Sequence, residues 1–453
     1  MSQEPNQLRE DSLGLVASIA MGVAGTAPCF SIAATTGTLF ATVGTLSTAS
    51  IFYCGLIMFG ITLSFFHLNR VMVSAGSSYT WVKEIFHPNL GFFVGWAILV
   101  SATVFMVSGT IPAATGLLSF VGSSATNDPH TVMFCAMGLL ILVGFIVVKG
   151  IKLASYVQTI ITVFEVGVLV AVIVGVLINF QTAPVKPFVL SELSFTAFSP
   201  ATFALGSLTA LFFFWGWDVT LNLSEETTQS AANPGKGAVW AMVIALLIFT
   251  SFTVATQIAL TDQEIQEAGT NIVLALSDKI FPKPFGYLVV LAVLLSTLGT
   301  LETTILQFTR TIFAKGRDGV VSPRLAVLHK QWKTPLFATL LIIGIGIVLL
   351  IISSFSPTVT EVIDVSVKAI GFQVAFYYGL TGFACAWHFR KEGRKSIVKF
   401  LTWFLWPLLS AIFISFVGIY SAFTFDLITT AIGLGGIAIG IIPFLYNRFT
   451  RAA

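Results

Sequence analysis

Three carboxyl side chains interrupt long apolar stretches of this sequence: Glu165, Asp218 and Glu302. No lysine or arginine is expected at the same depth, because Arg310 and Lys368 fall toward the ends of their apolar segments. A charged group at the centre of a bilayer costs about 2.5–3.5 kcal/mol on the milder insertion scales. Unpaired acids at that depth must be neutralised by protons or matched by a mobile cation. The chemistry they predict is reversible binding of protons or of a small cationic solute.

The apolar segments that hold these acids make up most of the chain. Of 453 residues, 56% are hydrophobic and 9% are charged, whereas soluble globular proteins average about 25% charged residues. This composition excludes a water-soluble domain, and a formal net charge of +3 indicates no basic surface for nucleic acid. The four cysteines and five histidines are scattered without metal-ligand spacing. We therefore expect no metal, no cofactor and no enzymatic activity.

Polar breaks divide the chain into segments long enough to cross a bilayer, which takes about 20 apolar residues. The acidic N-terminal residues lack a basic region, so the first segment is expected to be a retained span and not a cleaved signal. Reading the apolar runs in order predicts an all-α membrane protein with twelve transmembrane helices, near 14–40, 44–68, 90–121, 131–148, 153–179, 201–224, 237–260, 285–312, 335–354, 366–388, 399–423 and 427–447.

The basic residues predict the orientation of these spans. If both ends face the cytoplasm, most of the 23 lysines and arginines lie inside, and only Lys186, Lys279, Lys283 and Lys368 lie outside. The expected organisation is a cytoplasmic N-terminal tail, a first repeat, a second repeat, a last pair of helices and a cytoplasmic tail, at 1–13, 14–179, 201–388, 399–447 and 448–453.

Two of the predicted spans carry helix-breaking residues. The first contains Gly22, Gly25 and Pro28, and the sixth contains Gly216 followed by Asp218. Proline lacks an amide hydrogen and glycine weakens helical preference, so the ladder of backbone hydrogen bonds should open at both places. A packing kink is the alternative reading of either break alone. Breaks five spans apart favour two inverted five-helix repeats with a binding site near the midplane.

Three motifs resemble the amino acid–polyamine–organocation (APC) transporters. The first is AGSSYTW at 75–81 with GFFVGW at 91–96, the second is LSEE at 223–226 with Asn233 and Pro234, and the third is Arg310 with RDG at 317–319 and KTP at 333–335. This resemblance implies the five-plus-five inverted-repeat fold, often called LeuT-like, with helices 1 and 6 broken and two further helices at the C-terminal end.

Within that family, residues 21–28 look closest to the first span of bacterial putrescine importers. They lack the Gly-Ser-Gly type of break by which typical members hold an α-carboxylate, and Pro28 offers no amide. Glu302 is similar to an acid in the eighth span of plant polyamine uptake permeases. The resemblance implies a substrate site formed by Gly22, Ala24, Gly25, Thr26, Phe212, Phe214, Trp215, Gly216, Asp218 and Glu302.

Glu165 stands seven residues after Gln158, where related transporters carry a lysine that substitutes for a sodium ion in some proton-coupled members. An acid in its place indicates a proton-coupling group. For each acid, the alternative to binding protons or substrate is a structural role. This role is a helix-to-helix hydrogen bond for Glu165 or Glu302, and helix capping or gating for Asp218.

These observations predict a secondary transporter in the cytoplasmic membrane that moves a small organic amine, a polyamine or an amino acid by alternating access. Transport is expected to be coupled to protons or to exchange, with sodium as the alternative ion, and the protein to be a monomer or a homodimer. The competing interpretations are a neutral amino acid permease of the same fold and a transporter-like sensor that does not carry solute.

Overall fold

The structure is a computed structural model that describes residues 7–119, 128–354 and 359–452. In these residues the regular secondary structure is helical, with one isolated parallel bridge between Leu13 and Thr227. Ten helical stretches are long and apolar enough to cross a membrane. The all-α, multi-pass architecture is thereby confirmed. The count of twelve stays a prediction, because Leu15–Val71 is a single stretch in this count and the helix at Pro200–Phe213 is short.

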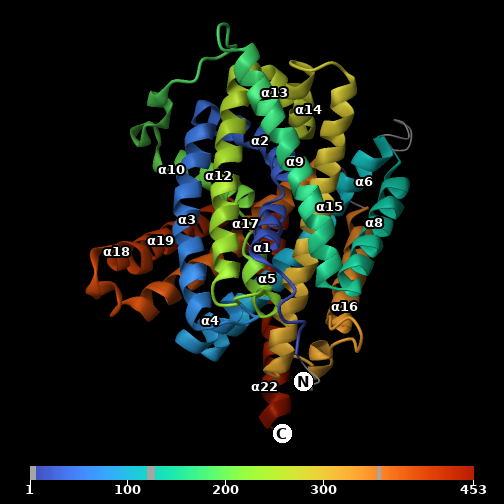
Figure 1. Cartoon of the computed structure of the whole chain (residues 1–453), viewed down its shortest axis with the longest axis vertical. Helices are drawn as coiled ribbons and strands as arrows, with labels where there is room; N and C mark the ends of the chain where they lie inside the picture. Colours follow the sequence, from blue (N-terminus) through green and yellow to red (C-terminus); the bar gives the residue numbers. More distant parts are fainter. Residues whose placement is uncertain (1–6, 120–127, 355–358, 453) are drawn as a thin grey trace.

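The helices run up and down the long axis of the molecule (Figure 1). The first half of the chain contains α1 (Leu15–Thr26), α2 (Pro28–Val43), α3 (Ser47–Val71), α4 (Ser78–Ile85), α5 (Pro88–Ser108), α6 (Thr110–Ser119), α8 (Pro129–Lys149), α9 (Ile151–Asn179), α10 (Pro200–Phe213) and α11 (Val219–Asn222). Short 3₁₀ turns within the same part of the chain are η1 (Gly44–Leu46), η2 (Leu190–Leu193) and η3 (Phe195–Ala197).

The second half contains η4 (Ser224–Glu226), α12 (Asn233–Ala259), α13 (Asp262–Ala268), η5 (Gly269–Asn271), α14 (Ile272–Asp278), α15 (Pro284–Arg317), η6 (Pro323–Ala326), α16 (Leu336–Ser353), α17 (Val359–Phe389), η7 (Gly393–Lys395), α18 (Ile397–Lys399), η8 (Phe400–Leu405), α19 (Trp406–Ala422), α20 (Leu427–Thr430), η9 (Ala431–Gly435), α21 (Gly436–Ala438) and α22 (Ile441–Ala452). We call the end with α4 and α22, where both chain ends are marked in Figure 1, the terminal end, and the end with α13 and α14 the distal end.

The first predicted break is confirmed. Helix α1 ends at Thr26, Ala27 adopts a left-handed conformation with φ 46°, and α2 begins at Pro28. Proline suits the first position of a helix, because its fixed φ is already helical and the amide it lacks would have no partner there. The sequence Ala27-Pro28 therefore ends one helix and starts the next within a single apolar segment.

The sixth predicted segment is also interrupted where expected. Helix α10 ends at Phe213, the next helix begins at Val219, and Gly216 between them has φ +99°. This conformation strongly favours glycine, since a Cβ atom would clash with the backbone.

The two breaks touch each other. A Cβ atom built on Gly25 would lie 2.1 Å from the Gly216 carbonyl oxygen, and one built on Gly216 would lie 2.2 Å from the Gly25 carbonyl oxygen. Neither contact is sterically possible, so both positions require glycine for the backbones to meet as they do.

Candidate functional site

Four aromatic rings, three from helices and one from the sixth-segment break, meet beside the two breaks. Phe30 of α2 lies 5.7 Å from Phe105 of α5 and 6.4 Å from Phe212 of α10, measured between ring centroids. Trp215 completes the group at 5.5 Å from Phe105 and 6.2 Å from Phe212. All four side chains are buried. Phe30 and Phe105 were not predicted, because their sequence surroundings are those of ordinary apolar helices.

Asp218 lies at the end of the sixth-segment break and is held by neutral donors. Its Oδ2 accepts a hydrogen bond from Gln307 Nε2 at 2.7 Å and one from the Tyr377 hydroxyl at 3.2 Å, and its Oδ1 accepts one from Tyr378 at 2.8 Å. Trp215 donates its indole N–H to the Tyr377 hydroxyl at 2.9 Å. The acid thus links the break to α15 and α17 without a cationic partner.

Glu165 lies on the buried face of α9, opposite the start of α2. Its side chain is inaccessible to solvent. The polar groups that approach its carboxyl are the Ser296 hydroxyl and the Cys29 backbone amide. Within the described residues, neither oxygen completes a well-formed hydrogen bond. The structure therefore brings the predicted coupling residue to the first break.

Glu302 is buried on α15, but its neighbours on that helix show that it does not face the breaks. Thr300 donates a hydrogen bond to the Gly25 carbonyl at 3.0 Å, and Gln307 bonds Asp218. Two residues correspond to about 200° around an α-helix, so Glu302 projects nearly opposite to Thr300. Its Oε1 atom has no hydrogen-bond partner among the described residues.

The remaining predicted substrate residues fall into two groups. Gly25 and Gly216 meet at the contact between the breaks, Trp215 belongs to the aromatic group beside it, and Thr26 ends α1 at the first break, whereas the others pack elsewhere. Phe214 packs on Phe249 of α12, with ring centroids 5.4 Å apart. A Cβ on Gly22 would meet Ala241 of α12 at 2.7 Å. Thr26 donates its hydroxyl to the Val23 carbonyl at 2.7 Å, and Ala24 is buried in α1.

None of the ion pairs formed within residues 7–119, 128–354 and 359–452 includes Glu165, Asp218 or Glu302. The same part of the chain contains no cluster of three or more His, Cys, Asp or Glu side chains arranged to hold a metal ion.

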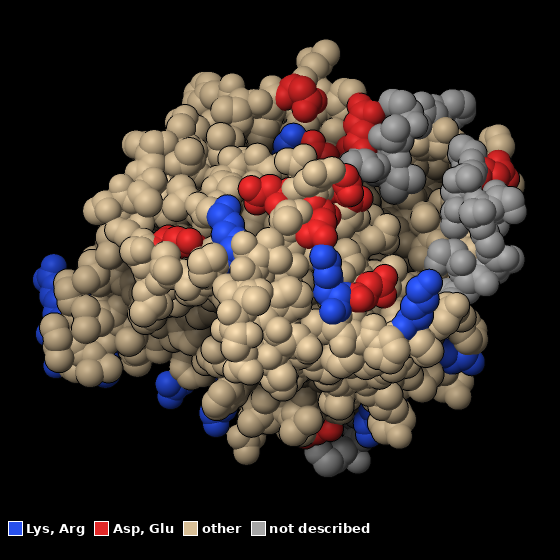
Figure 2. All heavy atoms as spheres, turned by 90° about the horizontal axis from the view of Figure 1, so that it is seen from above, with Lys and Arg blue, Asp and Glu red and all other residues tan. Residues whose placement is uncertain are grey.

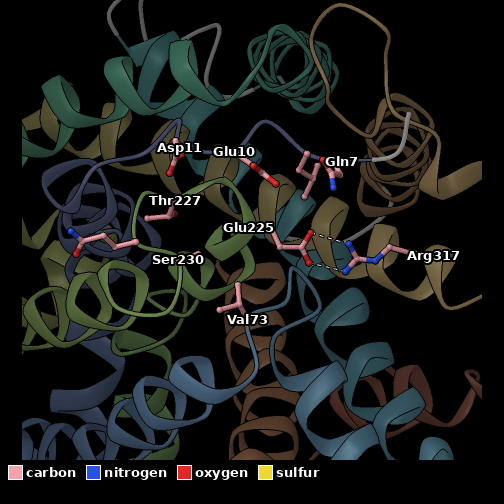
Figure 3. Close-up of a pocket in the computed structure, with 10 residues that line it drawn as sticks. Gln7, Glu10, Asp11, Val73, Glu225, Thr227, Ser230 and Arg317 are labelled. Carbon is pink, nitrogen blue, oxygen red and sulfur yellow. Dashed lines mark hydrogen bonds and ion pairs between the residues drawn. The ribbon is translucent and has the colours of Figure 1, made fainter. Parts of the chain in front are cut away.

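The terminal end is closed by paired acids. Glu226 and Arg310 form a bidentate ion pair at 2.8 and 2.9 Å, and their side chains are 1% and 0% exposed. Beside them, Glu225 forms a second bidentate pair with Arg317 at 2.7 and 2.9 Å (Figure 3). Glu225 also accepts a hydrogen bond from the Ala75 amide.

The N-terminal segment crosses this closed end. The amides of Ser12 and Leu13 donate to the Glu226 carbonyl, and the Thr228 amide donates to the Leu13 carbonyl. A cavity of about 520 Å³ lies between this segment and the Glu225–Arg317 pair (Figure 3). Gln7, Glu10 and Asp11 of the segment line it. None of the residues that line this polar cavity belongs to either break.

The distal end holds a vestibule of about 440 Å³, lined by residues of α2, α10, α13, η5 and α17. Ala34 and Thr209 contribute to its wall, and Phe30 and Phe212 lie one turn deeper on the same two helices. The aromatic group therefore separates the vestibule from the breaks. Seen from above, this end carries many acidic side chains (Figure 2), which include Asp262, Glu264, Glu267, Asp278, Glu361 and Asp364.

Comparison with known proteins places this geometry in a family. An amino acid permease family model matches residues 13–442. The chain is 25% identical over 460 residues to the low-affinity putrescine importer PlaP of Escherichia coli (strain K12), covering 95% of this chain and 94% of the importer. It is 24% identical over 332 residues to the serine/threonine exchanger SteT of Bacillus subtilis (strain 168), covering 70% of each.

A solved structure shares the fold. The crystal structure of a manganese transporter from Eremococcus coleocola superposes with a TM-score of 0.62 at 13% identity, covering 99% of this chain and 98% of that one. At this identity the likeness concerns the fold alone. Because the family model covers nearly the whole chain, the protein belongs to the amino acid permease family of the APC superfamily and is a membrane transporter, not an enzyme.

Proposed function

We propose that this transporter moves a small organic amine, such as a diamine, across the cytoplasmic membrane by alternating access. The observation that carries the proposal is the set of three buried carboxyl groups without a fixed cationic partner. Asp218 lies at the end of the sixth-segment break, where the hydroxyls of Tyr377 and Tyr378 donate to it and Trp215 donates to the Tyr377 hydroxyl. A carboxylate bordered by aromatic rings binds ammonium groups through charge-assisted hydrogen bonds and cation–π attraction.

The start of α2 supports an amine over an amino acid. The N-terminus of a helix binds carboxylates through its free backbone amides. Here Pro28 has no amide, the Cys29 amide faces the Glu165 carboxyl, and the Phe30 amide donates to the Ser296 hydroxyl at 3.3 Å. The Phe30 amide is thus already used, and the Cys29 amide points toward a carboxyl group of the chain itself, which disfavours a substrate carboxylate here. An amine without a carboxylate has no such requirement.

The two ends of the molecule differ in the way expected of one state in an alternating-access cycle, with one end closed and the other open. We assign the terminal end to the cytoplasm, because the basic residues gather there. Ion pairs close that end, while the vestibule opens the distal end toward the outside. The acidic distal face raises the local concentration of cationic solutes at the entrance.

We assign proton coupling to Glu165. A carboxyl at that depth is stable only with a proton or a cation bound, and it faces the break that must move during the cycle. Sodium is the alternative coupling ion. Within the same proposal, the substrate residues are Gly25, Trp215, Gly216 and Asp218, with Phe212 as part of the aromatic barrier.

Neutral amino acid transport is the second candidate function. It is favoured by the family model and by the relatives that are named as amino acid transporters, which include SteT and the branched-chain amino acid permease BcaP of Lactococcus lactis. The two candidates differ in whether the substrate carries a carboxylate.

An uptake panel in proteoliposomes distinguishes them. The purified protein is tested with labelled putrescine, agmatine, arginine, serine and leucine, each with and without a proton gradient and with and without sodium. We expect saturable putrescine or agmatine uptake that neutral amino acids do not inhibit. Uptake of serine or leucine with no competition from the amines would contradict the proposal and establish the second candidate.

A further inference from the structure

Glu302 faces a second group of polar side chains, which lies in the seam between α9 and α15. A Cβ atom built on Gly299 would lie 2.6 Å from Gln158 Nε2 and 2.8 Å from its Oε1, so the Gln158 amide rests directly on Gly299. Residues three apart on a helix have Cβ atoms about 5–6 Å from each other. Glu302 is three residues after Gly299, so it lies on the same side of α15 as the position against which the Gln158 amide rests, without a direct hydrogen bond between the two side chains in the described residues.

Gln158 connects this carboxyl to Glu165. The two residues are seven apart on α9 and share one face of the helix, about 10.5 Å apart along its axis. Thr162 lies between them, and Gln158 Nε2 donates to its hydroxyl at 3.3 Å. Glu165, Thr162 and Gln158 thus follow one face of α9, and Gln158 rests on α15 at Gly299, three residues before Glu302. We call Glu165, Thr162, Gln158 and Glu302 together the polar seam. Each of these side chains is buried.

The polar seam is incompletely hydrogen bonded. Both carboxyl oxygens of Glu165, the Oε1 atom of Gln158 and the Oε1 atom of Glu302 lack partners among the described residues. Unpaired buried polar atoms are costly and uncommon. Three such side chains in the seam indicate that something polar binds there during part of the cycle.

Few other titratable groups face the seam. Among the helices packed against α9 and α15, helices α1, α5, α6, α11 and α16 contain no titratable side chain, and α2 contributes only Cys29 at the Glu165 end. Of the remaining ones on neighbouring elements, Cys135 is partly exposed on α8, and the others lie toward the ends of their helices, at His130, Lys149, Lys236, Asp278 and Arg324. On α9 and α15 themselves, Lys152, Tyr156 and Tyr287 are exposed, and Arg310, Lys315 and Arg317 follow Glu302 by two or more helical turns.

We propose that the polar seam is a proton-binding path separate from the substrate route. Glu302 is then the second proton carrier beside Glu165, and the two carboxyls exchange a proton across Gln158 and bound water. Neither Glu302 nor Gln158 touches the substrate, because the face of α15 that meets the breaks carries Thr300 and Gln307 instead. The proposal rests on the proposed function only in assuming that transport is proton-coupled.

The test compares substrate binding with proton movement for Glu302→Gln and Gln158→Leu. Proteoliposomes loaded with a pH-sensitive dye report the proton uptake that accompanies putrescine, and a thermal-shift titration reports putrescine affinity. Gln373→Leu is the matched control, because Gln373 is a buried glutamine on α17 whose amide donates to the Ile432 carbonyl.

We expect both seam variants to bind putrescine within about twofold of the parent and to retain exchange, while substrate-linked proton uptake falls at least tenfold. Glu165→Gln should show the same loss, and Gln373→Leu should not. A tenfold weaker affinity in Glu302→Gln would make Glu302 a substrate ligand and overturn the proposal. Unchanged proton uptake in both seam variants would also overturn it.

The test distinguishes failure of the proposed proton path from failure of the proposed function. If the parent transports serine or leucine and not putrescine, the same variants are measured with the transported amino acid. Proton uptake that is then lost in the seam variants supports the path and contradicts only the amine assignment. The absence of any proton uptake by the parent, with sodium driving transport instead, would refute the path itself.

Discussion

The acids of the terminal end and those in the middle of the membrane differ in how they are neutralised. At the terminal end, Glu226 is paired with Arg310 and Glu225 with Arg317, each through two hydrogen bonds. In the middle, Asp218 has only neutral donors, and Glu165 lacks a completed hydrogen bond. The first arrangement holds the closed end together without any ligand, whereas the second needs a proton or a cation from solution. The difference separates residues that lock a conformation from residues that bind what is carried.

The largest effect is expected from breaking the buried pair at the terminal end. Arg310→Met leaves the Glu226 carboxylate buried and uncompensated, which costs about 3–5 kcal/mol of folding free energy. Thermal unfolding of the purified protein in detergent measures the loss. The double variant with Glu226→Leu should recover most of it, since an apolar pair of similar size is close to neutral.

Arg317→Met is the control for that experiment. Arg317 and Glu225 have side chains that are 40% and 20% exposed, and exposed ion pairs contribute only about 0–1 kcal/mol. Equal destabilisation by Arg310→Met and Arg317→Met would show that burial does not distinguish the two pairs, and the locking role assigned to Glu226 would fail.

The next effect is expected at the contact between the breaks. Gly216→Ala places a Cβ atom 2.2 Å from the Gly25 carbonyl oxygen, and such overpacking costs about 1–3 kcal/mol. We expect a lower melting temperature and nearly complete loss of uptake. Gly138→Ala on α8, where a Cβ has open space, should leave both unchanged. Normal transport by Gly216→Ala would mean that the cycle does not pass through this contact.

A smaller effect is expected on substrate affinity. Asp218→Asn keeps the shape of the side chain but removes its charge. A hydrogen bond to a charged group contributes about 1.5–3 kcal/mol, so putrescine affinity should fall about ten- to a hundredfold. Asp364→Asn in the vestibule is the control, and its affinity should change little because Asp364 is already paired with Lys368 at 2.6 Å. Unchanged affinity in Asp218→Asn would leave Asp218 as a structural acid.

The smallest effect is expected at the distal surface. The hydrogen bond from Lys279, with that from the Thr261 amide, lowers the pKa of Glu264 to about 2. A carboxyl with a lowered pKa stabilises the fold above its unfolded pKa of about 4.3 and loses this contribution as the pH falls toward 2. It stays ionised between pH 7.5 and pH 5. Lys279→Gln should therefore leave the pH profile of uptake between pH 7.5 and pH 5 unaltered. Glu165→Gln, in contrast, should abolish the pH dependence of uptake. A changed profile in Lys279→Gln would assign part of the pH dependence to the surface.

Several features could be predicted because they depend on neighbouring residues. Pro28 and Gly216 interrupt their helices through local backbone geometry alone, and both breaks appear where the sequence places them. The membrane character follows from composition, and the absence of fixed cations near the buried acids follows from where lysine and arginine stand in the apolar segments.

Other features depend on which helices meet. Tyr377 and Tyr378 bind Asp218 from a helix about 160 residues away in the chain, and Phe105 joins the aromatic group from α5. Two adjacent tyrosines in an apolar segment were the only available signal for the first contact. The sequence favoured Glu302 as a substrate ligand, whereas in the structure Thr300 and Gln307, and not Glu302, are the α15 residues that bond to the breaks.

Hydropathy, charge distribution and helix-breaking residues by themselves determined that this chain spans a membrane, interrupts two helices and carries three acids within its apolar segments, because each of these properties is set within one or two helical turns. Only the tertiary structure decided which of those acids meets the breaks and which lies in the seam. The reason is that α15 packs against several other helices at once, so its sequence alone does not tell which neighbour each face will meet.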